Sequence, residues 1–173
     1  GMHIKENRAP TVLVRVTGDL AAAGYAIGKE IEGETPYFVF DRRPAEWELK
    51  LLGAALAATG SVPMFHVEGI TPEWNDFERP REKVEVEGKV ERDCDVELVA
   101  IGCPHVSGEE LKLILELMRG RKVRREMWIF ASRRVAEEHL EVVEKLEDLG
   151  AKVFCDTCMV VSPASERFGC IMV

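Results

Sequence analysis

The stretch VELVAIGCPHVSGEEL, residues 96–111, decides the fold class of this chain. Residues 96–101 are apolar except for Glu97, which is typical of a strand buried in a parallel sheet. Ser107 and Glu110 have the spacing of a capping box, in which each side chain binds a free amide at the start of a helix. A buried strand followed at once by a capped helix predicts an α/β fold.

The same alternation continues toward the C-terminus. The pattern predicts a helix that ends at Gly120, a strand at 127–131, a long helix from Ser132 to Gly150 and a strand at 151–155. Strands joined by helices run parallel, so we expect a layered α/β/α arrangement around a mainly parallel sheet. Ligands bind such sheets at the carboxyl ends of the strands. The loops that follow the strands are therefore the places to look for functional residues.

The N-terminal half is less regular. Its pattern predicts strands at 11–16, 37–40 and 62–67 and helices at 20–31 and 45–58. Residues 75–95 form a charged excursion, within which residues 85–90, around Gly88, are compatible with a polar hairpin or with a loose loop. The length of 173 residues fits one domain, so we expect a single α/β domain over 1–173.

Composition excludes several classes of protein. Hydrophobic residues make up 46% of the chain, enough for a core, and a net charge of −8 argues against nucleic-acid binding. A membrane span needs about 18 consecutive apolar residues, and no such run occurs. With no charged-then-apolar leader, we expect a cytoplasmic protein whose five cysteines are buried thiols, metal ligands or redox groups.

The first motif that carries chemistry is Gly102-Cys103-Pro104-His105-Val106-Ser107. It lies between a strand and the N-terminus of a helix, where free amides and the helix dipole favour a thiolate at Cys103. A thiolate can bind iron or zinc or attack an electrophile. The alternative is a buried cysteine in a tight turn that Pro104 shapes.

The second motif is Cys155-Asp156-Thr157-Cys158 at the end of the last predicted strand. The two cysteines can form a redox dithiol, supply half of a metal site, or be unlinked. Cys103 and Cys158 both follow strands of the expected sheet. We therefore expect the two thiols to converge at its carboxyl edge.

The third motif is FHVEGITPE, residues 65–73. His66 or Glu68 can transfer a proton, and Thr71 can donate a hydrogen bond to a substrate. The alternative is that His66 is a core residue and that Thr71 only starts a helical turn. A further segment, Ser132-Arg133-Arg134, can hold an anionic group, although Ser132 can equally be a simple helix cap.

Together these motifs resemble the aconitase X family. The family pattern includes GAALA followed by a small residue and glycine, then FHVxGxTPE, AxGCPHxSxxE and DTC with apolar residues and proline. Its segments match residues 53–60, 65–73, 100–110 and 156–163 in the same order. The resemblance covers most of the chain from about residue 37 onward.

The resemblance implies an aconitase-like domain from an iron–sulfur hydro-lyase. It makes Cys103 and Cys158 the expected cluster ligands, and His66, His105 and Ser107 the candidate catalytic residues. Cys155 lies outside the family motif. Family catalytic subunits are about twice as long, so we expect this chain to be an inactive fragment whose third cluster ligand lies elsewhere.

The resemblance also implies a small swivelling-domain subunit as partner and a small hydroxy acid as substrate. Abundant Glu, Lys and Arg give the chain a thermophile-like composition, which favours the archaeal members of the family, which dehydrate phosphomevalonate, over those that dehydrate hydroxyproline. Two alternatives to a dehydratase remain open. One is a non-catalytic binding domain, and the other is a redox protein that uses Cys155 and Cys158.

Overall fold

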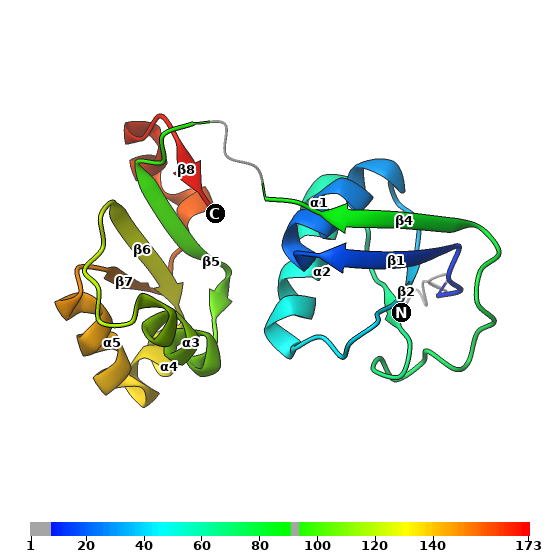
Figure 1. Ribbon diagram of the computed structural model, residues 1–173, viewed down its shortest axis with the longest axis horizontal. Helices are drawn as coiled ribbons and strands as arrows, with labels where there is room; N and C mark the ends of the chain where they lie inside the picture. Colours follow the sequence, from blue (N-terminus) through cyan, green and yellow to red (C-terminus); the bar gives the residue numbers. More distant parts are fainter. Residues whose placement is uncertain (1–7, 91–93) are drawn as a thin grey trace, which may run out of the picture. The chain divides into compact units, whose positions relative to one another are not determined.

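The computed structural model describes residues 8–90 and 94–173. The chain divides into two compact units, Gly1–Glu91 and Arg92–Val173, each built around its own four-stranded, all-parallel sheet (Figure 1). The expected α/β class with parallel strands is confirmed. The expected single domain is corrected to two units, because the strands of each half pair only among themselves.

In the residues that the structure describes, the first unit contains four strands and two helices, with strand order β3-β2-β1-β4. Its elements are β1 (Val12–Gly18), α1 (Leu20–Glu30), β2 (Pro36–Val39), α2 (Glu46–Gly60), β3 (His66–Val67) and β4 (Lys83–Gly88).

Both helices of the first unit cover the same face of the sheet. Val14 of β1, Ile27 of α1 and Leu56 of α2 belong to one buried cluster and are fully inaccessible to solvent. The helices approach at Gly28 and Gly60, where an added Cβ on Gly60 would collide with the Gly28 carbonyl. The absence of a Cβ at this pair therefore allows the helices to approach closely.

Strand β4 corrects the expectation for the charged excursion. Residues 83–88 form a parallel edge strand beside β1, with Val84 and Val86 against the core and Lys83, Glu85 and Glu87 exposed. The expectation of a hairpin or loose loop is wrong for these residues, because their apolar–polar alternation fits a strand with one covered face. Residues 91–93 of the excursion lie outside the described residues.

The second unit has strand order β7-β6-β5-β8. Its elements are β5 (Leu98–Val106), α3 (Gly108–Met118), β6 (Glu126–Ala131), α4 (Arg133–Glu138), α5 (Leu140–Asp148), β7 (Lys152–Cys155), the 3₁₀ turns η1 (Met159–Val161) and η2 (Pro163–Arg167), and β8 (Ile171–Met172).

The sheet of the second unit is covered on both faces. Helices α3, α4 and α5 pack over Ile129 and Ala131 on one side, and an aromatic cluster with Trp128 and Phe130 is covered by the C-terminal segment on the other. The long helix expected after Ser132 is divided into α4 and α5 at His139. Within the described ranges, no helix is long and apolar enough to cross a membrane.

Strand β5 changes register between Ile101 and Val106, which shapes the loop that carries Cys103. Gly102 has φ +120°, a value that side chains rarely adopt, and an added Cβ would collide with the Phe130 carbonyl of β6. The peptide bond between Cys103 and Pro104 is cis. Cys103 and Pro104 are both exposed.

A disulfide that the sequence analysis did not expect joins Cys94 to Cys170, with their Cα atoms 6.2 Å apart. The backbone amide of Glu97 donates to the Cys170 carbonyl at 3.0 Å, and the Gly169 amide donates to the Glu97 carboxylate at 2.7 Å. These contacts hold β8 beside β5. The pair closes a loop with a sequence separation of 76 residues.

We expect Cys94→Ser to lower the free energy of unfolding of the second unit by about 2–4 kcal/mol, because the open chain gains entropy when unfolded. Urea denaturation with and without dithiothreitol measures the effect. Reductant should lower the stability of the wild type to that of the variant and leave the variant unchanged. A wild type that is insensitive to reductant would contradict the disulfide.

Candidate functional site

The two cysteine motifs of the second unit meet at the carboxyl edge of its sheet. The His105 imidazole donates from Nε2 to the Thr157 carbonyl at 2.7 Å, which joins the C-terminal end of β5 to the loop after β7. Cys103 lies two residues before His105, and Cys158 directly follows Thr157. The topology thus brings together two segments that are 52 residues apart.

The three free cysteines differ in their surroundings. Cys103 is exposed, whereas Cys155 and Cys158 are half-buried. Cys155 pairs with Ala131 across the sheet and packs against the helix-side core. Among the described residues, no group of three or more His, Cys, Asp or Glu side chains could hold a metal ion.

Ser107 is the N-cap of α3, as the capping-box spacing predicted. Its hydroxyl accepts a hydrogen bond from the Glu110 amide at 3.3 Å, and the Glu110 carboxylate accepts one from the Ser107 amide at 2.7 Å. Glu110 is buried in this arrangement. The capping box gives a rigid start to the helix next to Cys103, and the exposed Ser107 hydroxyl keeps a proton to donate.

The Ser132-Arg133-Arg134 segment does hold an anionic group, and that group is Asp156 of the same chain. Oδ1 of Asp156 accepts from the Arg133 amide at 2.9 Å, and Oδ2 accepts from Arg133 Nε at 3.0 Å. Ser132 is also the N-cap of α4, where its hydroxyl accepts from the Val135 amide. The sequence pattern offered both roles for this segment, but it did not identify the partner.

His66 lies in the first unit with its imidazole 1% exposed. Its Nε2 donates to the Arg8 carbonyl at 2.7 Å, and its ring packs against Phe77 with centroids 5.0 Å apart. This is the arrangement of a core histidine, one of the two alternatives that the sequence left open. Thr71 exchanges hydrogen bonds with the backbone of Val67, so it closes a local turn.

Glu68 follows His66 and is held by two neighbours. Arg79 donates from Nε and from a terminal nitrogen to the two carboxylate oxygens, each at 2.6 Å. The Tyr37 hydroxyl donates to the same carboxylate at 3.4 Å. Burial and, secondly, the negative charge of Glu68 raise the pKa of Tyr37 above its ordinary value of 10.0.

This pKa shift predicts a loss of stability in alkali. The unfolded Tyr37 phenol ionises near pH 10, while the folded state still holds its proton, so the stability that it contributes disappears as pH rises through the higher folded pKa. Thermal unfolding between about pH 8 and pH 11 should show a shallower decline for Tyr37→Phe than for the wild type. The exposed Tyr25 provides the control, and equal slopes for Tyr37→Phe and Tyr25→Phe would contradict the prediction.

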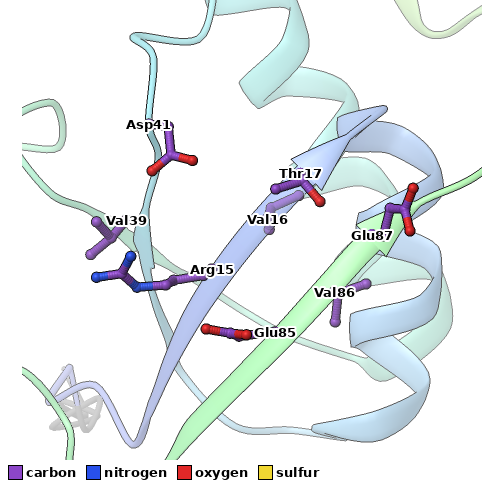
Figure 2. Close-up of a pocket in the computed structure, with 8 residues that line it drawn as sticks. All are labelled: Arg15, Val16, Thr17, Val39, Asp41, Glu85, Val86 and Glu87. Atoms are coloured by element: carbon purple, nitrogen blue, oxygen red, sulfur yellow. The ribbon is translucent and has the colours of Figure 1, made fainter.

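The face of the first sheet opposite the helices carries a polar depression of about 310 Å³ (Figure 2). Arg15 and Thr17 of β1 line it together with Asp41, Glu85 and Glu87. Lys83 and, as a weaker cause, Arg15 hold the pKa of Glu85 below its ordinary value. The sequence pattern does not mark these residues as functional, because charged residues that alternate with buried ones are typical of the solvent-exposed face of a strand.

Comparison with known families assigns both units. Residues 10–96 match the family model described as the aconitase X second domain, and residues 96–173 match the aconitase X third domain. The border between these matches lies close to the border between the two compact units.

Individual relatives match over nearly the whole chain. The phosphomevalonate dehydratase large subunit of Methanosarcina mazei is 45% identical over 100% of this chain and 47% of its own length. The protein of that name from Thermococcus kodakarensis is 39% identical over 94% of the chain and 47% of its own length. The cis-3-hydroxy-L-proline dehydratase of Pseudomonas aeruginosa is 33% identical over 91% of the chain and 32% of its own length. The chain thus spans about half the length of the phosphomevalonate dehydratase subunits that it matches.

Proposed function

Because the chain belongs to the aconitase X family, we propose that it comprises the second and third domains of a phosphomevalonate dehydratase large subunit. The whole protein would then be a hydro-lyase that removes water from phosphomevalonate. The observation that carries this proposal is the 45% identity over the full chain to a relative of that name, against 33% for the hydroxyproline dehydratase.

We propose Cys103 and Cys158 as two ligands of an iron–sulfur cluster. Both thiols are free, both lie in the joined loops at the carboxyl edge of the second sheet, and thiolates are the usual ligands of such clusters. The donor set therefore fits, with a third ligand supplied from outside this chain. When bound, a cluster with an open iron supplies a Lewis acid for the hydroxyl that leaves the substrate.

The chain's own residues would contribute orientation and hydrogen bonding. His105 would hold the two ligand loops at a fixed separation, because its Nε2 proton is committed to the Thr157 carbonyl. The exposed Ser107 hydroxyl would donate to an anionic oxygen of the substrate beside the start of α3. His66 belongs to the first unit, and a part for it in proton transfer remains a prediction.

We further propose that a small subunit completes this cytoplasmic enzyme. The large-subunit name of the relatives supports a second subunit. Val160 and Val161, which directly follow Met159 beside Cys158, are 77% and 72% exposed. Two adjacent exposed valines next to the thiol fit a surface that another part of the enzyme covers.

The test is an assay of the full-length large subunit, purified anaerobically with the small subunit from the same organism. We expect water loss from phosphomevalonate, followed by mass spectrometry of the product, and little or none from cis-3-hydroxy-L-proline. A preference for cis-3-hydroxy-L-proline would show that phosphomevalonate is the wrong substrate, while the proposed loss of water would stand. Failure with both substrates, in a preparation that is folded and contains iron, would overturn the proposal.

A further inference from the structure

We propose that Arg133 and Asp156 form a clamp that positions Cys158 for metal binding. The inference rests on the proposed function, because it assigns a second pair of residues to the site in which Cys158 is a ligand. Neither residue touches a cluster or substrate in this role. They act through the backbone of the loop that follows β7.

Three hydrogen bonds fix Asp156. Its carboxylate accepts from the Arg133 amide at 2.9 Å and from Arg133 Nε at 3.0 Å, and its own amide donates to the Ala131 carbonyl at 3.1 Å. These partner groups belong to Ala131, the last residue of β6, and to Arg133, the first residue of α4. Asp156 therefore ties the loop after β7 to the loop after the neighbouring strand.

The backbone of Asp156 has an uncommon conformation. Its φ is +57°, in the left-handed region, which residues other than glycine adopt less readily. The contacts to Arg133 stabilise this conformation and direct the chain toward Cys158. Without the clamp, the loop can relax to an ordinary conformation and carry Cys158 with it.

The rest of the loop is held on both sides of Cys158. The Thr157 carbonyl accepts from His105, and Met159 is buried in the aromatic-side cluster. Asp156, Thr157 and Met159 are thus each attached to a different neighbour. Cys158 is the residue among them whose position these attachments determine.

If Arg133 and Asp156 only stabilised the fold, their replacement would lower stability, whereas a positioning role predicts weaker metal binding with an intact fold. The side chains of Arg133 and Asp156 are 66% and 50% exposed, and exposed ion pairs contribute little to stability. Loss of the pair should therefore leave the fold intact. Groups that orient metal ligands typically change metal affinity or activity 10–100-fold when they are replaced.

The experiment uses the assembled large and small subunits carrying Arg133→Gln, Asp156→Asn or Arg133→Lys. We expect iron to be lost to an added chelator about 10–100-fold faster in the first two variants, with melting temperatures within about 3 °C of the wild type. Arg133→Lys should lie between them and the wild type, because it keeps a positive charge near the Asp156 carboxylate but lacks the Arg133 Nε donor. The control is Arg134→Gln, which removes a comparable exposed pair with Glu138 on the same helix.

A second measurement needs neither metal nor activity. In the reduced chain, iodoacetamide should modify Cys158 several-fold faster in Asp156→Asn and Arg133→Gln than in the wild type, while Cys103 reacts at an unchanged rate. Unchanged reactivity of Cys158 would overturn the clamp, and so would wild-type iron retention in both variants. An inactive wild-type complex with altered Cys158 reactivity in the variants would instead count against the proposed function alone.

Discussion

Replacing Cys103 or Cys158 by serine is expected to remove the iron–sulfur cluster and the dehydratase activity from the assembled enzyme. A neutral hydroxyl is a far poorer ligand for iron than a thiolate, and such clusters rely on very few protein ligands. Each variant should contain no iron above background and should lose activity by at least about 10³-fold, corresponding to roughly 4 kcal/mol. Colorimetric iron analysis and visible absorbance measure the cluster directly.

Matched cysteines provide the controls for this experiment. Cys155→Ser changes a thiol three residues from Cys158 that packs against the core, and Cys94→Ser removes a disulfide partner. Both should keep iron, although Cys94→Ser should be less stable. The same series tests the redox alternative, since a reversible bond between Cys155 and Cys158 would disappear in either single variant. An enzyme that keeps full iron and activity after losing both Cys103 and Cys158 would refute the site.

The isolated chain gives a complementary expectation. Two thiols cannot hold a cluster firmly, so the chain purified by itself should be colourless, free of iron and inactive. Adding the remaining part of the large subunit and the small subunit should restore brown colour and water loss. Stable iron binding by the isolated chain would show that it supplies more ligands than Cys103 and Cys158.

Gly102→Ala is expected to destabilise the second unit by about 4 kcal/mol. Alanine must adopt φ +120° there, and its Cβ would collide with the Phe130 carbonyl and lie 2.9 Å from the Phe130 Cβ. The backbone strain of a positive φ lowers stability by about 1–3 kcal/mol, and the collision with Phe130 lowers it by about the same amount. The two sheet residues cannot move apart without breaking the β5–β6 ladder. Urea denaturation of the wild type and the variant measures the difference.

Gly120→Ala separates the two causes. Gly120 also has a positive φ, +71°, but an added Cβ would meet no atom within 4 Å among the described residues. Gly120→Ala should lower the free energy of unfolding by only about 1 kcal/mol, because it adds backbone strain but no steric collision. Equal effects at Gly102 and Gly120 would show that the contact with Phe130 is unimportant. A stable Gly102→Ala variant would contradict the register shift in β5.

Local patterns in the sequence predicted most of the helices and strands. The Ser107–Glu110 capping box forms as expected, because its contacts join residues within one helical turn. The α/β class follows in the same way from the alternation of buried strands with helices. The motifs at the ends of the strands were also enough to identify the family and to nominate Cys103 and Cys158.

Contacts between segments that are distant in the sequence were not predicted. The sequence does not reveal that β4 pairs with β1, from which it is separated by residues 19–82, so the charged segment resembled a loop. The break at His139 lies within a continuous helical pattern and depends on packing. The partners Cys94 and Cys170 are 76 residues apart, and five cysteines allow many pairings.

By itself, the sequence determined the class of the fold, the family and the residues capable of the chemistry, because these depend on residue type and on spacing within a few residues. Only the tertiary structure decided that the strands form two sheets, that His105 joins the cysteine loops and that Arg133 binds Asp156. These contacts depend on which strands become neighbours. That choice is made by the burial of side chains from distant segments in a common core, a property of the whole chain that no local pattern contains.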